Sequence, residues 1–98
     1  MIVEIASFKL LDSADEKAFL AAHKGVHDTW VKVQPGFISR DTYKDTAGNW
    51  RDVVIWDSIH HATQAAERIM QTEEAGFWMQ MMDQDSVQMY HGESVMSF

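Results

Sequence analysis

Two histidines spaced four residues apart, His23 and His27, are the side chains best suited to chemistry in this sequence. On a helix this spacing places the two imidazole rings one turn apart, as a metal pair requires. The glutamate of a metalloprotease helix is missing, and the chain contains no cysteine, so we expect no metal site. A buried neutral imidazole, with a reference pKa of about 6.5, could instead take a proton from a phenol or quinol. We therefore assign His23 as the candidate general base, the alternative being an ordinary core histidine.

Aromatic side chains form the second group of candidates. Trp30, Phe77 and Trp78 could clamp a flat aromatic ligand, and Tyr90 could orient a ligand hydroxyl. We add His27, which lies at the edge of the same helix face as His23, to these ligand-binding candidates. Core packing is the alternative use of the aromatic residues, as it is for the seven methionines. Three aspartates, Asp41, Asp52 and Asp57, lie on strands that could be neighbours, but the sequence does not pair them.

Length and composition predict one globular domain over residues 1–98, with 46% hydrophobic and 23% charged residues. The net charge is −7 and the eight lysines and arginines are scattered, so we expect no nucleic-acid partner. No stretch resembles a signal peptide or approaches membrane-spanning length, so we expect a cytoplasmic protein with no membrane contact.

Residues 49–57 form the most informative predicted strand. Val53, Val54, Ile55 and Trp56 are consecutive apolar residues, and successive strand side chains point to opposite faces, so both faces must be covered. Residues 2–11 show the same two-sided apolar pattern and predict another central strand. Because the chain is short, its helices can cover only one face of the sheet. We therefore expect a second copy of the chain to cover the other face.

The helix between these strands is predicted from a cap at Asp12 or Ser13 to about Val33, where Pro35 and Gly36 end it. Its apolar stripe contains His23 and is formed by Phe19, Val26, Trp30 and Val33.

The remaining elements complete an alternating order. Residues 37–44 predict an edge strand that forms a hairpin with residues 49–57. A helix capped by Asp57 or Ser58 follows, then a second helical piece over residues 72–82 and a last strand over residues 86–98. This order predicts an α+β, ferredoxin-like βαββαβ fold with an antiparallel sheet and with helices on one face.

A resemblance to a known family lies in the order of the elements, in the Pro35-Gly36-Phe37 junction and in the Trp56-Asp57-Ser58 end of the third strand. In these features the chain resembles the antibiotic biosynthesis monooxygenase family of dimeric α/β barrels. The resemblance implies a homodimer whose sheets meet back to back, with one pocket per subunit between sheet and helices. Its members include cofactor-independent oxygenases of phenols and quinols, haem-degrading enzymes and proteins without a known reaction.

The best-understood members of that family use a pocket asparagine with a tryptophan and a histidine or tyrosine. Here the only asparagine is Asn49, at the end of the hairpin. On the first strand, Ser7 occupies the position where the resemblance implies the asparagine. Trp56 matches the family's strand-ending tryptophan, in a position that also suits a structural role. No catalytic triad is carried over, although Ser7 and Trp56 join the candidate ligand-binding residues.

Two function classes follow from these residues and this resemblance. One is a monooxygenase without metal, flavin or haem that acts on a small aromatic phenol or quinol. The other is a non-catalytic dimer that binds a small ligand or is associated with stress. A third possibility, a haem-degrading enzyme, ranks below both.

Overall fold

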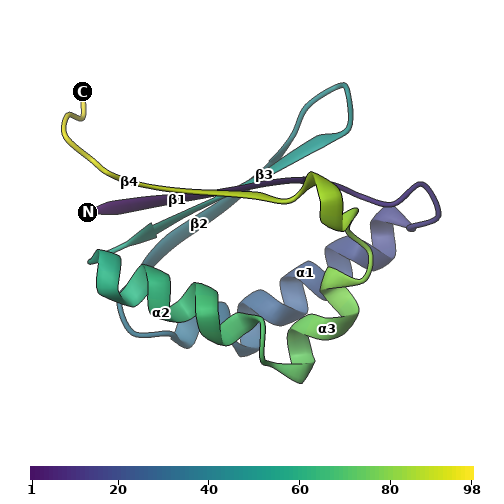
Figure 1. Ribbon diagram of the computed structural model, residues 1–98, viewed down its shortest axis with the longest axis horizontal. Coiled ribbons are helices and arrows are strands. Elements are labelled where there is room, and N and C mark those ends of the chain that lie inside the picture. The colour runs from purple at the N-terminus through teal and green to yellow at the C-terminus, as the bar shows by residue number, and fades with distance from the viewer.

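Four antiparallel strands form an open sheet, and all the helices pack against one of its faces (Figure 1). The computed structural model describes residues 1–98, the side chain of Glu74 excepted. The strands are β1 (Ile2–Lys9), β2 (Phe37–Lys44), β3 (Asn49–Trp56) and β4 (Gln88–Glu93). The helices are α1 (Glu16–Thr29), α2 (Ile59–Ile69) and α3 (Glu73–Met79), with short 3-10 turns η1 (Val31–Val33) and η2 (Gln84–Ser86). The predicted α+β ferredoxin-like fold is confirmed, and the sheet of one chain does not close into a barrel.

The strand order β2-β3-β1-β4 places the two strands with two-sided apolar patterns at the centre. In β1, Glu4 and Phe8 point toward the helices and are buried, whereas Val3 and Ile5 point to the open face and are half-buried. Val3 lies opposite Ile55 in β3, so apolar side chains continue across that open face. The predicted edge position of residues 37–44 is also confirmed.

The helix α1 is shorter at both ends than the sequence predicted. It starts after Asp15 rather than after Asp12 or Ser13, because the Ala14 N–H donates to the Leu11 carbonyl and closes a turn there. It ends at Thr29 rather than Val33 because Trp30 leaves helical geometry at φ −128°, and the β-branched Val31 and Val33 continue in the tighter turn η1.

The boundaries in the second half of the chain also differ from prediction. α3 ends at Met79 rather than at residue 82, and Met82 instead forms a bridge with Leu10, beyond the end of β1. The last strand covers Gln88–Glu93 rather than residues 86–98. Ser86 belongs to η2 and its hydroxyl accepts a hydrogen bond from the Lys9 N–H, while the Ser94 N–H bonds Met1 at the far end of β1. β4 ends there because β1 offers no further residue for pairing.

Two sequence signals fix how α2 leaves the sheet. Ser58 caps α2 as predicted, its side chain accepting a hydrogen bond from the His61 N–H. Gly36 has φ +83°, and a Cβ there would lie 2.4 Å from a carboxylate oxygen of Asp57. Only glycine therefore fits this junction, where the Asp57 N–H also bonds the Gly36 carbonyl. No helix in the described part of the chain is long and apolar enough to cross a membrane.

Candidate active site

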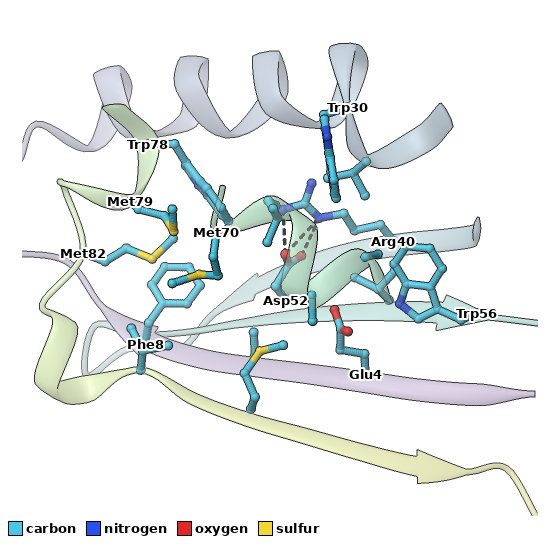
Figure 2. Close-up of a pocket in the computed structure, with 18 of the residues that line it drawn as sticks. Glu4, Phe8, Trp30, Arg40, Asp52, Trp56, Met70, Trp78, Met79 and Met82 are labelled. Atoms are coloured by element: carbon cyan, nitrogen blue, oxygen red, sulfur yellow. Dashed lines mark hydrogen bonds and ion pairs between the residues drawn. The ribbon is translucent and has the colours of Figure 1, made fainter. Parts of the chain in front are cut away.

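A cavity of about 260 Å³ lies between the sheet and the helices (Figure 2). Its wall is mainly apolar and includes the tryptophans Trp30, Trp56 and Trp78 together with Phe8. Large rigid rings of this kind suit contact with a flat aromatic ligand. The sheet side of the cavity also carries three charged residues, Glu4, Arg40 and Asp52.

The alternation of the strands brings these charged residues to the cavity. In β1 and β3 every second residue points to the helices, which places Glu4, Ala6 and Phe8 on the cavity side of one strand and Asp52 and Val54 on that of the other. Thr42 on β2 lies directly opposite Asp52, so Arg40, two residues away on the same face, is a diagonal neighbour of Asp52. The charged groups therefore come from three adjacent strands.

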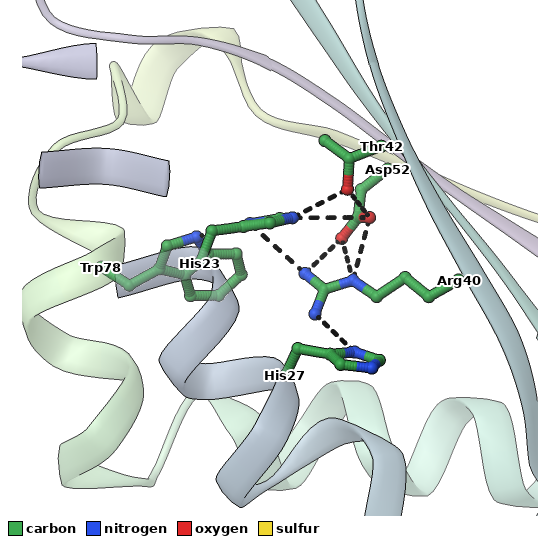
Figure 3. Close-up of polar contacts among 6 residues, drawn as sticks. All are labelled: His23, His27, Arg40, Thr42, Asp52 and Trp78. Carbon is green, nitrogen blue, oxygen red and sulfur yellow. Dashed lines mark hydrogen bonds and ion pairs between the residues drawn. The ribbon is translucent and has the colours of Figure 1, made fainter. Parts of the chain in front are cut away.

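Arg40 and Asp52 form a buried ion pair with fork-like geometry (Figure 3). Arg40 Nε donates to both carboxylate oxygens at 2.9 Å, and Nη2 donates to Oδ2 at 2.6 Å. The two side chains are only 4% and 8% exposed. Arg40 also donates to His27 Nδ1 at 3.4 Å and lies 6.0 Å from the ring centre of Trp78. Such a pair is strongly coupled, because either charge alone would be costly to bury.

His23 completes this cluster from α1, and its neighbours fix its tautomer. Trp78 Nε1 donates to His23 Nδ1 at 3.0 Å, and Arg40 Nη2 lies 3.5 Å from the same atom. Tryptophan and arginine can only donate, so Nδ1 must be the acceptor and Nε2 must carry the hydrogen. Nε2 then donates to Thr42 Oγ1 at 2.8 Å, and that hydroxyl donates to Asp52 Oδ1 at 3.1 Å. The lone pair of His23 is thus already occupied.

The electrostatic surroundings keep His23 neutral. Burial and the nearby positive charge of Arg40 lower the pKa of His23 to about 4. The same two causes, burial first, lower the pKa of His27. Neutral His23 holds Trp78 and Thr42 in place, whereas a protonated ring would present an N–H to the Trp78 N–H.

This neutral histidine predicts an acid-labile fold. Unfolded His23 binds a proton below about pH 6.5 and folded His23 only below about pH 4, so acidification through this window favours the unfolded state. We expect a loss of about 3 kcal/mol of unfolding free energy between these pH values. Urea unfolding of the wild type and of His23→Gln at pH 7 and pH 4 measures it, because other groups, including Glu4, contribute equally to both proteins. Equal losses in the two proteins would contradict the assignment.

Glu4 is paired with a histidine from the last strand. His91 lies directly opposite Glu4 across β1 and β4, and its Nε2 is 2.7 Å from Glu4 Oε2. Glu4 is 8% exposed, and burial raises the pKa of its carboxyl, against the opposing effects of His91 and Trp56. His91 engages Oε2, and the Glu4 side chain also lines the cavity.

Trp56 adds a hydrogen-bond donor to the same end of the cavity. Its side chain is 2% exposed, and its buried Nε1 makes no hydrogen bond of good geometry, although the indole N–H lies near enough to Glu4 to lower the pKa of that carboxyl. Figure 2 shows Trp56 and Glu4 at the same end of the cavity. A buried N–H without a well-aligned partner costs folding free energy, and the Glu4 carboxylate is an acceptor within its reach.

Comparison with solved structures identifies the fold that carries this site. No protein-family model and no curated protein matches the sequence. An antibiotic biosynthesis monooxygenase superposes with a TM-score of 0.76 at 13% identity, covering 97% of this chain and 99% of the other. The chain has the antibiotic biosynthesis monooxygenase fold. The resemblance found in the sequence is thereby confirmed at the level of the fold.

Two further structures share this fold. SnoaB, a cofactor-independent oxygenase from Streptomyces nogalater, gives a TM-score of 0.78 at 9% identity, covering 98% of this chain and 94% of its own. The protein At3g17210 from Arabidopsis thaliana gives 0.79 at 10% identity, covering 100% and 99%. At these identities the likeness concerns the antibiotic biosynthesis monooxygenase fold alone.

Within this fold the structure separates the predicted site residues into three groups. Trp30, Trp56 and Trp78 line the cavity. His23 and His27 lie behind its wall and contact Arg40. We expected His23 to line the cavity, but it does not. The others lie away from the cavity: Ser7 and Tyr90 on the open face of the sheet, and Phe77 on the surface. Trp78 is buried whereas its neighbour Phe77 is 64% exposed, because adjacent helical residues face different directions.

Sequence reasoning missed Glu4, Arg40 and His91 as site residues. Glu4 carried a usable signal, because a carboxylate in the middle of a strand predicted to be buried on both faces needs a partner or a function. Arg40 lay in an alternating polar strand and carried no such signal. Within the described residues no three His, Cys, Asp or Glu side chains come together to hold a metal ion.

Proposed function

We propose that this protein is a cofactor-independent monooxygenase that acts on a small aromatic phenol or quinol bound in the tryptophan-lined cavity. The observation that carries the proposal is the pairing, at one end of an apolar cavity, of the Glu4 carboxylate with the neighbouring N–H of Trp56. Together they offer one acceptor for a ligand hydroxyl hydrogen and one donor for a ligand oxygen. The fold shared with a cofactor-independent oxygenase supports the proposal.

Glu4 acts as the base in this proposal, in place of His23. Its raised pKa makes it a stronger base than an ordinary carboxylate, and it lines the cavity while His91 holds Oε2. His23 cannot take a proton on Nδ1 without losing the hydrogen bond from Trp78. We assign His23, Thr42 and Asp52 to positioning Arg40 and Trp78 at the cavity wall.

The reaction begins when Glu4 removes the hydroxyl proton of the substrate and the Trp56 N–H stabilises the resulting oxyanion. The electron-rich anion then reduces O2 directly, and one oxygen atom becomes bonded to a ring carbon. The second oxygen atom leaves as water with two hydrogens of the substrate, so a phenol and O2 give a quinone and water. The apolar wall excludes bulk water from the reactive intermediate.

The second candidate function is ligand binding without chemistry. The observation in its favour is that Arg40, Asp52, His23 and Thr42 satisfy one another, which leaves few polar groups for a substrate. In that case the cavity holds a small aromatic molecule through the tryptophans alone.

Oxygen uptake separates the two functions. A panel of naphthols and naphthoquinols is mixed with the purified protein in an oxygen electrode, and the uncatalysed oxidation of each compound is subtracted. We expect uptake above background for at least one compound, with one atom of labelled O2 in the quinone product by mass spectrometry. Tight binding of a panel member with background uptake would favour the non-catalytic function instead.

We also propose that two copies pair through the open face of the sheet. Val53 lies on this half-buried face, whereas Val54 is 4% exposed and faces the core. An apolar face of this kind is typical of an obligate interface. We expect sedimentation at micromolar concentration to give a dimer for the wild type and a loss of the dimer for Val53→Asp. Val54→Asp is the matched control, because its charge falls in the core and should unfold the protein. A monomeric wild type would contradict the proposal.

A further inference from the structure

The exposed residues of the cavity wall come from two segments of the described chain. Of the residues that line the cavity, four are exposed, and all the others are buried or half-buried. The exposed four are Met70 (65%), Met89 (49%), Val87 (38%) and Gln84. Met70 caps the end of α2, and the other three belong to the segment from η2 into β4. We call these four residues the rim.

A shallow surface hollow leads to this rim. It is lined by Leu11, Gly76 and Gln80 together with Met70, Met79, Met82 and Gln84, and the last four also line the cavity. The hollow and the cavity therefore lie side by side, with these four residues between them. Methionine side chains are flexible and apolar, so they can move aside and repack around molecules of different shape.

Met70 and the polar groups lie in different parts of the cavity. Figure 2 shows Met70 on the side of Met79 and Met82, away from Glu4 and Trp56. Met89 lies opposite Ala6, between Glu4 and Phe8 along β1. Glu4 and Trp56 are 8% and 2% exposed, whereas Met70 is mostly exposed. A ligand that enters beside Met70 and moves along the cavity therefore meets Glu4 and Trp56 with its leading end.

We propose that ligands enter between Met70 and Met89 with their oxygen-bearing end first, and that these two residues decide which molecules reach Glu4. The orientation rests on the proposed function, because it assumes that a hydroxyl meets Glu4, whereas the entry route does not. The cavity is small for a ligand site, since such sites typically hold about 300–1,000 Å³. Substrates with more than two fused rings therefore extend through the rim, and substituents remote from the hydroxyl are tolerated.

The absence of cysteine in the sequence permits a clean test of the entry route. Single-cysteine variants Met70→Cys, Met89→Cys and Leu20→Cys are alkylated with a bulky maleimide. Leu20 is a matched control because it is an exposed apolar residue on α1 that lines neither hollow. The probe is phenylnaphthylamine, a fluorescent molecule without a hydroxyl that reports binding to an apolar cavity.

We expect alkylation at position 70 or 89 to weaken phenylnaphthylamine binding by about tenfold or more, and alkylation at position 20 to leave it unchanged. Bound probe should also slow alkylation at positions 70 and 89 but not at position 20. Unchanged affinity after alkylation at both rim positions, or no binding of the probe to the wild type, would overturn the entry route.

Two isomeric bromonaphthols test the orientation by calorimetry. We expect bromine on the ring remote from the hydroxyl to leave the affinity of naphthol unchanged, and bromine beside the hydroxyl to weaken it about tenfold. The reverse order would overturn the proposed orientation. If the probe binds through the rim but no naphthol binds, the proposed function fails and the entry route stands.

Discussion

Replacing Arg40 with methionine is expected to lower the free energy of unfolding by about 3–5 kcal/mol. The reason is that Asp52, 8% exposed, would remain buried without the two-pronged ion pair that now compensates its charge. Thr42 still donates one hydrogen bond to Asp52, but a hydroxyl does not neutralise a carboxylate. Urea unfolding followed by circular dichroism at pH 7 measures the change.

A double variant separates the loss of the ion pair from the loss of packing. In Arg40→Met combined with Asp52→Leu both charges are gone, and buried ion pairs replaced by apolar residues often cost little. We expect the double variant to be more stable than Arg40→Met alone. If Arg40→Met is as stable as the wild type, the pair is not buried as described.

Replacing Glu4 with glutamine is expected to lower kcat by about 10²- to 10⁴-fold, the usual contribution of a general base. Glutamine has the same shape and can still accept the hydrogen bond from His91, but its amide cannot take the substrate proton. Burial disfavours the charge of Glu4, as its raised pKa indicates, so the variant should be no less stable than the wild type. Oxygen uptake at saturating substrate, with the best compound of the panel, measures the effect.

His23→Gln is the comparison variant for this experiment. It replaces the base that the sequence suggested, and we expect it to lower kcat by less than about tenfold, since His23 does not face the cavity. Full activity in Glu4→Gln together with a large loss in His23→Gln would return the role of base to His23.

The sequence predicted the sheet more reliably than the site. The two-sided apolar patterns of β1 and β3 determine their central positions, because only a central strand covered on both faces can bury such side chains. Helix ends were predicted less well, as the early end of α1 at Thr29 illustrates. There the choice between an α-helix and a 3-10 turn depends on how Trp30 packs, which periodicity does not reveal.

The site depends on pairings that a sequence pattern does not contain. The helical stripe correctly placed His23 on the buried face of α1, but its role follows from the donors Trp78 and Arg40, which come from other elements. The importance of Glu4 follows from the register that sets it opposite His91. Strand register between distant segments is fixed by the complete sheet, so neither contact was predictable from local spacing.

The pairing of β1 with β4 also governs when the protein can fold during synthesis. Glu4 and His91 are 87 residues apart, so the ribosome must complete β4 before this hydrogen bond can form. Until then a nascent chain can form α1 and the hairpin of β2 and β3, while β1 keeps one edge unpaired. An unpaired apolar strand edge can pair with other chains, so β1 is exposed to aggregation until β4 has been made.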